Sequence, residues 1–313
     1  MRGEKILIVG PTGNTGPTIC RYLADGNEVW ALARFSSPEA EQALKDMSVI
    51  TYRGDLSSGE FPDLPDDFTY VVNLAAFIGP GLDFDYAMRV NAEGPGLIMQ
   101  HCRKVKAFLQ VSTGGVYATD PDPWRLKDEA FPTAPTYFPF SPSYGYSKLA
   151  GEGVVRTMAR VLGLPTTIAR LNAGYDASGG LPAYQLDWIR SGLPVPHPAD
   201  DVVYTPLHHE DMARQVELML AVASVPATIT NWCGDETVSI RQWCDYFGEI
   251  LGRPIEYIEG APHQSSGMDS TRRRQLVGPC HLDWRTGMRR LVDERPAGLD
   301  PRAAQVRTLF LPA

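Results

Sequence analysis

The stretch that decides the fold is Ile6-Leu7-Ile8-Val9-Gly10-Pro11-Thr12-Gly13-Asn14-Thr15-Gly16. Its four apolar residues predict a buried strand, and residues 18–23 continue at helical spacing after the glycines. Glycines spaced as GxxGxxG between a strand and a helix permit a sharp turn and let a pyrophosphate approach the backbone N–H groups at the positive end of the helix. A tight turn without a ligand would be the simpler explanation of the glycines. The stretch nevertheless predicts a dinucleotide site at Gly10, Thr12, Gly13, Asn14, Thr15 and Gly16.

Buried strands and helix-compatible stretches alternate along the first half of the chain. After the opening strand, further strands are predicted at residues 28–33, 49–52, 70–75, 107–112 and 166–171. Helices are predicted between them, notably at residues 38–47, 91–104 and 143–162. Alternation of this kind is typical of an α/β protein with a doubly wound parallel sheet of the Rossmann type.

The composition changes after residue 171, where Pro, Gly and aromatic residues become more frequent. We therefore predict a dinucleotide-binding Rossmann domain over residues 1–171, with residues 203–232 returning to it. Residues 172–202 and 233–313 are predicted to form a small substrate-binding cap. A chain of 313 residues is long enough to bury such cores without disulfide or metal staples.

Net charge and cysteine usage limit the partners of the chain. Its 29 Lys and Arg against 37 Asp and Glu give a net charge of −8, which would repel a nucleic-acid backbone. No apolar run reaches the roughly 18 residues that span a bilayer. Five cysteines without CxxC or zinc-type spacing indicate reduced thiols. We therefore expect a cytoplasmic protein that acts on a small-molecule substrate, with no nucleic acid and no membrane as partner.

The segment Tyr144-Gly145-Tyr146-Ser147-Lys148 carries the predicted chemistry. On a helix, Tyr144 and Lys148 share one face, and a neighbouring ammonium favours the phenolate and so lowers the pKa of the tyrosine. Tyr144 is thereby suited to act as an acid/base near neutral pH. Ser112 and Thr113 stand at the end of a predicted strand, where a hydroxyl can bond to a substrate oxygen at the same edge of the sheet.

The end of the second strand indicates which dinucleotide is bound. An acid there bonds to the ribose 2′-hydroxyl of NAD, whereas a nearby arginine accommodates the 2′-phosphate of NADP. The sequence at this point is Arg34-Phe35-Ser36-Ser37, which contains no acid. We therefore predict NADP, with NAD as the less favoured alternative. Asp55, just after the third strand, is placed either to accept a hydrogen bond from the adenine amine or to cap a turn.

Several motifs together resemble the short-chain dehydrogenase/reductase superfamily. They are GxxGxxG, Asn73-Leu74-Ala75-Ala76, Ser112-Thr113-x-x-Val116-Tyr117 and Tyr144-x-x-x-Lys148. The length and the later segment at residues 208–213 are similar to the extended branch, which contains nucleotide-sugar epimerases and dehydratases as well as carbonyl reductases. The resemblance implies that His208-His209-Glu210-Asp211 is a strand-to-helix junction, so no metal site is expected.

The resemblance also implies roles for single residues. Tyr144 is implied to be the general acid/base, Lys148 its pKa-lowering partner and a ribose ligand, and Thr113 the hydroxyl that orients the substrate. Asn91 matches a helix asparagine of the family, although a helix N-cap would explain it equally well. A homodimer through the helices at 91–104 and 143–162 is compatible with the family. The expected cofactor ligands beyond the glycine loop are Arg34, Asp55, Leu56, Leu74, Ala75, Ala76, Asn91, Tyr144, Lys148, Leu171 and Ala173.

Departures from the nucleotide-sugar pattern bear on the substrate. Ala173 and Asp176 stand where such family members usually carry Asn and Gly, and Asp200 and Asp201 lie where a phosphate-binding arginine is usual. Carboxylates there would oppose a diphosphate. Aromatic residues suit an apolar compound instead, although the core of the cap is the simpler role for each one taken singly. The expected substrate residues are Phe77, Thr113, Tyr175, Trp188, His197 and Tyr204.

These patterns together predict an NADP-dependent oxidoreductase that interconverts a carbonyl and an alcohol by hydride transfer, acting on an apolar or aromatic small molecule. One alternative is a nucleotide-sugar epimerase or dehydratase that holds its cofactor tightly and regenerates it in each cycle. Another is a non-catalytic module that senses NADP, against which the intact Thr113, Tyr144 and Lys148 count.

Overall fold

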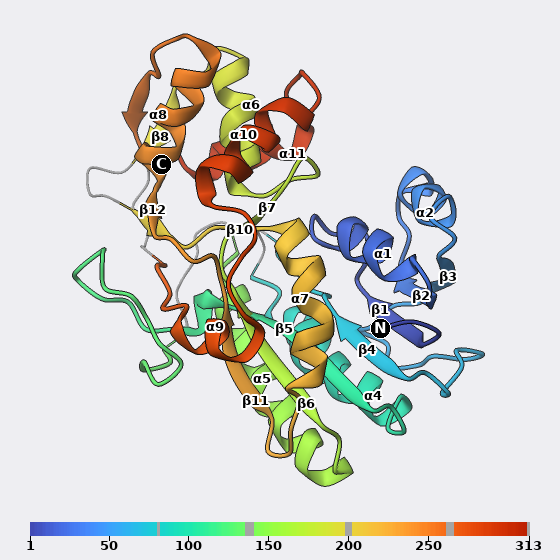
Figure 1. Ribbon diagram of the computed structural model, residues 1–313. Coiled ribbons are helices and arrows are strands. Elements are labelled where there is room, and N and C mark those ends of the chain that lie inside the picture. Colours follow the sequence, from blue (N-terminus) through green and yellow to red (C-terminus); the bar gives the residue numbers. More distant parts are fainter. Residues whose placement is uncertain (80–81, 135–140, 198–201, 261–265, 312–313) are drawn as a thin grey trace.

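The structure, a computed structural model, describes residues 1–79, 82–134, 141–197, 202–260 and 266–311. Its centre is a seven-stranded parallel sheet with the spatial order β11-β6-β5-β4-β1-β2-β3 (Figure 1). The strands are β1 (Lys5–Val9), β2 (Glu28–Ala33), β3 (Ile50–Arg53), β4 (Tyr70–Asn73), β5 (Ala107–Thr113), β6 (Thr166–Leu171) and β11 (Thr228–Trp232). The predicted doubly wound α/β fold is confirmed.

Alternating residues of each strand bury two opposite faces of the sheet. On β1, Ile6 and Ile8 pack on one face, whereas Leu7 and Val9 pack on the other. The first face is covered by α1 (Gly16–Ala24) and α7 (His209–Ala221). The second is covered by α4 (Gly94–His101) and α5 (Tyr144–Leu162). Because both faces are buried, the strands read in the sequence as continuous apolar runs.

The remaining helices around the sheet are short. They are α2 (Pro38–Lys45), α3 (Phe84–Met88), a π-helical turn η1 (Arg89–Glu93), a 3-10 turn η2 (Gly114–Val116) and α9 (Thr271–Val277). Capping residues fix the start of α2 and the end of α5. The Ser37 hydroxyl accepts the N–H of Ala40 at the start of α2. Helix α5 ends at Gly163, whose φ of +63° is a left-handed conformation that glycine adopts without a Cβ clash.

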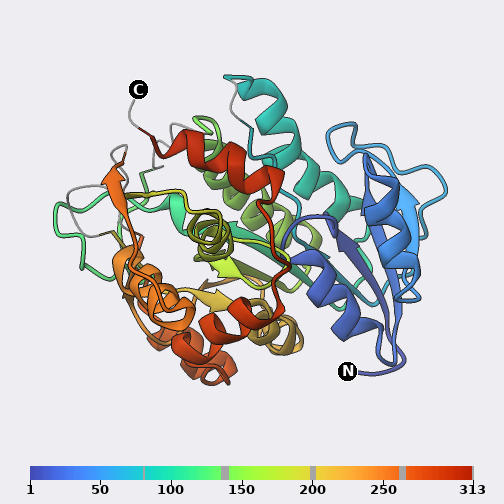
Figure 2. The ribbon, with the colours of Figure 1, turned by 90° about the horizontal axis from the view of Figure 1, so that it is seen from above.

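Four further helices form what we call the cap helices. They are α6 (Leu181–Arg190), α8 (Ile240–Leu251), α10 (Trp284–Glu294) and α11 (Pro301–Leu309). Figures 1 and 2 show them gathered on one side of the molecule, away from α2 and β3. They share a core of their own, in which Trp188, Trp243 and Phe247 are fully buried.

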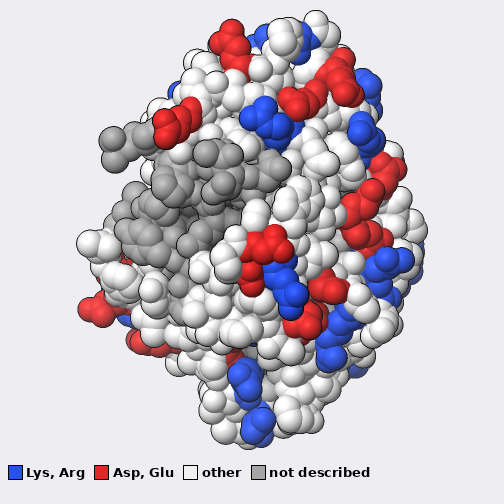
Figure 3. All heavy atoms as spheres, turned by 90° about the vertical axis from the view of Figure 1, so that its left-hand side faces the viewer, with Lys and Arg blue, Asp and Glu red and all other residues white. Residues whose placement is uncertain are grey.

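Short strand pairs connect the cap helices with the rest of the chain. The pairs are β7 (Gly174–Tyr175) with β10 (Leu207–His208), β8 (Val195–His197) with β13 (Tyr257–Glu259), and β9 (Val203–Tyr204) with β12 (Val238–Ser239). The face of the molecule in Figure 3 mixes acidic with basic side chains. Within the described ranges, no helix is both long and apolar enough to cross a bilayer. The same ranges hold no group of three or more His, Cys, Asp or Glu side chains that could bind a metal ion.

Candidate active site

A cleft of about 380 Å³ lies at the carboxyl ends of the central strands. The neighbours β1 and β4 form the switch point of the sheet, where the order of strands reverses and a crevice opens in folds of this class. The expected residues that line it are Gly10, Thr12, Gly13, Asn14, Thr15, Gly16, Arg34, Asp55, Leu56, Leu74, Ala75, Ala76, Phe77, Tyr144, Lys148 and Leu171. The others lie outside this lining: Asn91, Thr113, Ala173, Tyr175, Trp188, His197 and Tyr204.

The glycines of the loop after β1 fit a pyrophosphate for different steric reasons. A Cβ on Gly10, whose φ is +75°, would lie 2.6 Å from the Cα of Ala75, and one on Gly16 would collide with the carbonyl oxygen of Pro11. These two glycines let the loop pack against the end of β4 and on itself. A Cβ on Gly13 would meet only the Gly10 carbonyl oxygen, at 3.8 Å, so the space beside Gly13 is available to a phosphate. The loop leads into the N-terminus of α1, which favours an anion, and its residues therefore fit a dinucleotide.

Arg34 stands at the end of β2, as the sequence predicts for the residue that selects the dinucleotide. Its Nη1 donates to the hydroxyl of Tyr86 at 2.7 Å. In the described part of the chain, no carboxylate lies within ion-pair distance of this guanidinium. Arg53, by contrast, pairs with Glu41 at 2.6 Å and donates to the carbonyl oxygen of Arg34. Arg34 is therefore the guanidinium at this end of the cleft that can bind a phosphate.

Two expected cofactor ligands make local contacts that explain their positions. The Asp55 Oδ1 accepts the N–H of Ser57 at 2.9 Å, so this carboxylate caps a turn at the edge of the cleft. Asn91 lies in η1 and does not stand at a helix N-cap. Its amide accepts the N–H of Phe77 at 2.7 Å and donates to the Ser147 hydroxyl at 2.9 Å. Asn91 thus ties the loop after β4 to α5.

Tyr144, the expected acid/base, begins α5 and lies near Thr113 at the end of β5, close enough for Thr113 to influence its pKa. Burial raises the pKa of Tyr144, and Thr113 lowers it in part. The neighbouring Ser112 hydroxyl is turned elsewhere, because it donates to Glu152 at 2.6 Å. The structure thus brings Thr113, and not Ser112, close to the phenol.

Lys148 lies one turn after Tyr144 on α5 and also lines the cleft. Its Nζ donates to the carbonyl oxygen of Val111 at 2.7 Å and lies 3.5 Å from that of Ala75. Burial lowers the pKa of Lys148 to about 8, against the opposing effect of the Glu152 carboxylate. The expected lowering of the tyrosine pKa by this ammonium is not found here, because the Nζ is directed at backbone carbonyls.

Glu152 is a site residue that the sequence reasoning missed. Its carboxylate accepts hydrogen bonds from Arg170 and Ser112 and is nearly fully buried. It lies four residues after Lys148, so both share one face of α5. That spacing is the signal that could have found it. Tyr86, which binds Arg34, gives no such signal, because the two are far apart in the chain.

Four of the expected substrate residues lie in the core of the cap helices and their short strands. Trp188 is fully buried and donates to the carbonyl oxygen of Ala303 at 2.8 Å. Tyr204 packs on Trp243 with ring centroids 5.8 Å apart. Tyr175 is buried against His208, and His197 against Tyr257, each edge to face. The structure brings none of these four together with Phe77, which lines the cleft and meets the edge of Tyr86.

The carboxylate of Asp176 is held in a network between α1 and α7. It accepts the Thr18 hydroxyl at 2.7 Å and lies 3.0 Å from Nδ1 of His209. Burial would raise the pKa of Asp176, but His209 and the hydrogen bonds of Ser178 and Thr18 outweigh it and hold the pKa well below its usual range. The Asp176 carboxylate is therefore bound by Thr18 and Ser178 and lies outside the lining of the cleft, so it is not a free carboxylate that faces a diphosphate. Asp200 and Asp201 lie outside the described residues.

Comparison with known proteins places this architecture in a family. The model of the NAD dependent epimerase/dehydratase family matches residues 6–187. The chain belongs to this family. Membership in the epimerase/dehydratase family confirms the resemblance to the extended short-chain dehydrogenase/reductases. No curated protein matches the sequence.

Solved structures of several epimerases share the fold. UDP-glucuronic acid 4-epimerase from Bacillus cereus matches with 19% identity and a TM-score of 0.80, over 92% of this chain and 98% of its own. UDP-glucose 4-epimerase from Thermus thermophilus matches with 22% identity and a TM-score of 0.75 over the same shares. UDP-N-acetylglucosamine 4-epimerase from Methanobrevibacter ruminantium matches with 16% identity and a TM-score of 0.79, over 94% and 98%. At these identities the likeness concerns the fold of the epimerase/dehydratase family.

Proposed function

We propose that the protein is an NAD(P)-dependent epimerase or dehydratase of a nucleotide sugar. The observation that carries the proposal is the placement of Tyr144 and the buried Lys148 one turn apart on α5 at the end of a cleft that fits a dinucleotide, with Thr113 close enough to Tyr144 to influence its pKa. This arrangement suits the oxidation of a hydroxyl group and its later restoration. The nucleotide sugar thus replaces the apolar carbonyl compound as the first candidate substrate.

The proposed roles of the three side chains follow from their positions. Tyr144 takes the proton of the substrate hydroxyl as its phenolate and later returns it as the phenol, and Thr113 bonds to the same substrate oxygen. Lys148 lines the same cleft and is placed to bind the ribose of the dinucleotide, the other role that the family resemblance implies. The Val111 carbonyl oxygen holds the Lys148 ammonium at the edge of the sheet, and the Glu152 carboxylate favours its charged form. The nicotinamide, when bound, supplies the reversible acceptance of hydride.

Two observations support a nucleotide sugar as the substrate. The Bacillus cereus relative is described with UDP-glucuronic acid and NAD, and the Thermus thermophilus relative with NAD. The second observation is that the Asp176 carboxylate, which would oppose a diphosphate if it were free, is bound by the hydroxyls of Thr18 and Ser178 and lies outside the cleft lining. The presence of NAD in the descriptions of both solved structures also favours NAD as the cofactor under this proposal.

A second candidate function is an NADPH-consuming reductase of an apolar carbonyl compound. Arg34, which has no carboxylate partner in the described residues, favours the 2′-phosphate of NADP. The cleft is also lined by an exposed apolar side chain, Ile78, which is 56% exposed. These two observations support a cofactor that exchanges in every cycle and a substrate with an apolar body.

The deciding experiment follows the fate of the cofactor. Purified protein is denatured, and the nucleotide that it releases is identified by mass spectrometry. Native protein is then incubated with UDP-glucose or UDP-glucuronic acid without added cofactor, and the products are resolved by NMR. A 4-epimer or a dehydrated sugar, formed without net change in the absorbance of reduced cofactor, supports the first candidate.

Other outcomes of this experiment count against the first candidate. Net oxidation of NADPH that matches the reduction of an added aldehyde or ketone, with no nucleotide sugar converted, supports the reductase. Tight binding of NADPH with neither conversion contradicts both enzymatic functions and favours the non-catalytic module.

A further inference from the structure

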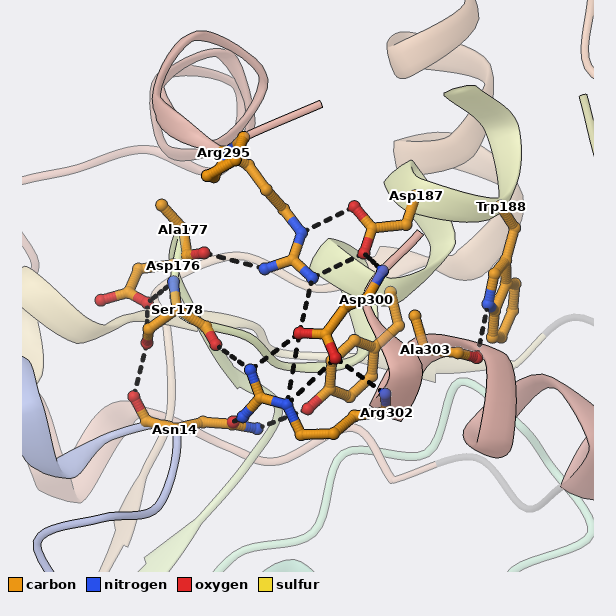
Figure 4. Close-up of polar contacts among 12 residues, drawn as sticks. Asn14, Asp176, Ala177, Ser178, Asp187, Trp188, Arg295, Asp300, Arg302 and Ala303 are labelled. Carbon is orange, nitrogen blue, oxygen red and sulfur yellow. Dashed lines mark hydrogen bonds and ion pairs between the residues drawn. The ribbon is translucent and has the colours of Figure 1, made fainter. Parts of the chain in front are cut away.

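Asn14, in the middle of the glycine loop, is held by side chains that are more than 160 residues away in the sequence. Its Nδ2 donates to the hydroxyl of Tyr184 on α6 at 3.0 Å, and its Oδ1 accepts from Nη1 of Arg302 on α11 at 2.7 Å. Its carbonyl oxygen accepts the Ser178 hydroxyl at 2.6 Å. Figure 4 shows Arg302 and Ser178 reaching Asn14 from two sides. The loop that would surround a pyrophosphate is thus bound to the cap helices through one residue.

Arg302 is oriented toward Asn14 by a carboxylate of its own helix. Asp300 accepts from Nε of Arg302 at 3.2 Å and from Nη2 at 2.8 Å, and it also accepts the backbone N–H of Arg302 at the start of α11. The same Nη2 donates to the carbonyl oxygen of Ser178 at 3.0 Å. Asp300 compensates the charge of the guanidinium, so Arg302 acts on the loop through Asn14 and not as a free cation for a phosphate.

The network has an anchored end and an accessible end. Arg295 binds Asp187 of α6 through two hydrogen bonds of 2.7 and 2.6 Å, and both side chains are nearly fully buried. Arg295 also reaches Asp300 at 3.4 Å (Figure 4). The Arg302 side chain is 52% exposed. Because exposed contacts open more readily than buried ones, the Arg302–Asn14 bond is the point at which the network opens.

We propose that Arg302 is a positioning residue that holds the glycine loop closed and thereby slows the release of the bound dinucleotide. The pyrophosphate is bound by N–H groups of this loop, so the loop must move before the dinucleotide leaves. Movement of Asn14 breaks its bonds to Arg302 and Tyr184. The proposal rests on the dinucleotide site proposed above and is independent of the reaction, because an epimerase and a reductase use the same loop.

The test compares the rate of dinucleotide release in matched variants of the full chain. Arg302→Ala removes the bond to Asn14. Arg307→Ala is the control on the same helix, because its Nη2 donates to the carbonyl oxygen of Pro194 at 2.9 Å. Bound NADPH or NADH is displaced by an excess of the oxidised nucleotide, and the loss of its fluorescence gives the dissociation rate. Amide hydrogen exchange of residues 12–16 is measured in the protein without dinucleotide.

The expected result is a dissociation rate about tenfold faster in Arg302→Ala, the effect of one lost charge-assisted hydrogen bond, with Arg307→Ala at the wild-type rate. Arg302→Lys should restore part of the effect, and residues 12–16 should exchange faster in Arg302→Ala. If Arg302→Ala cannot be purified, Tyr184→Phe removes the second bond to Asn14 and should act in the same direction. A release rate and a loop exchange that are equal in Arg302→Ala and Arg307→Ala would overturn the proposal. Failure of the wild type to bind either dinucleotide would instead count against the proposed function.

Discussion

Glu152 and Arg170 form a buried, two-bond ion pair, with Nε 3.0 Å from Oε1 and Nη2 2.8 Å from Oε2. The pair joins α5 to β6, and the Ser112 hydroxyl of β5 donates to the same Oε1. Arg170 also lies over the ring of Tyr117, 4.7 Å from its centroid. The helix that carries Tyr144 and Lys148 is thus held against two strands at the edge of the cleft. A site that depends on the distance between a helix and a strand end needs such a support.

Removing one partner of this pair should destabilise the protein strongly. Glu152→Gln leaves the buried Arg170 charge uncompensated, so we expect the free energy of unfolding to fall by about 3 kcal/mol. Urea denaturation at neutral pH measures the loss. Glu249→Gln, at an exposed position of α8, is the control and should change stability little. Equal stability of the two variants would contradict the supporting role of the pair.

Tyr144 and Tyr146 give a matched pair for testing the acid/base. Tyr144→Phe removes the phenol that lines the cleft, and we expect turnover to fall by about a thousandfold, the size of a lost general acid/base. Tyr146→Phe removes a phenol two residues away whose side chain is 47% exposed, and turnover should remain at the wild-type level. Turnover is measured with the substrate found in the cofactor-fate experiment, and circular dichroism verifies folding. A Tyr144→Phe variant of full activity would refute the assignment.

Substitutions at two glycines of the loop should have different effects, one on the stability of the fold and the other on dinucleotide binding. In Gly16→Ala the new Cβ collides with the backbone of Pro11, so we expect a large loss of thermal stability. In Gly13→Ala the Cβ meets no close atom and takes the space beside the loop, so the protein should fold normally and lose affinity for the dinucleotide. Thermal melting and a fluorescence titration with NADPH and NADH measure the two effects. Undiminished affinity in Gly13→Ala would mean that no phosphate lies against this glycine.

Arg34 should decide between the two dinucleotides. If it binds the 2′-phosphate, Arg34→Ala weakens the affinity for NADPH by about 10- to 100-fold, the effect of a lost charge-assisted hydrogen bond. The affinity for NADH, which lacks this phosphate, should stay nearly constant in the same variant. Fluorescence titrations with both nucleotides give the two dissociation constants. Equal binding of NADPH and NADH by the wild type would contradict the preference for NADP.

The sequence was sufficient to predict the sheet and the glycine loop, for local reasons. Buried strands such as residues 166–171 stand out as apolar runs, and the observed β6 has the same bounds. The placement of Tyr144 and Lys148 one turn apart on α5 follows equally from helical spacing. These features depend on residues that are close in the chain, so a single sequence contains them in full.

Contacts between distant segments could not be predicted in this way. Arg302 and Asn14 are 288 residues apart, and no periodicity relates them. The aromatic residues show a second reason. Trp188 was expected at the substrate, but a buried core position and a pocket position both favour a large apolar ring, so residue type alone does not separate them. The structure separates them through the contacts of Trp188 with Ala303 and Phe310, which belong to the cap core.

The buried His208 should make the stability of the protein depend on pH. Its ring is buried against Tyr175, and its Nδ1 accepts the N–H of Glu210 at 3.2 Å. Burial lowers the pKa of His208 to about 4 from the ordinary 6.5, with the Asp176 charge opposing the shift. Between these values the unfolded chain binds a proton that the native protein does not, so stability is full above pH 6.5 and falls as the pH drops toward 4.

The size of this effect can be measured against a variant that does not titrate. From neutral pH to about pH 5 the loss from His208 amounts to about 2 kcal/mol. His208→Asn keeps an acceptor for the Glu210 N–H but does not titrate. Between neutral pH and about pH 5, the free energy of unfolding of this variant should therefore fall by about 2 kcal/mol less than that of the wild type. His281→Asn, at an exposed position, serves as the control and should follow the wild type. Urea denaturation at the two pH values gives all the differences, and an identical pH dependence in wild type and His208→Asn would show that His208 is protonated equally in the native and unfolded states.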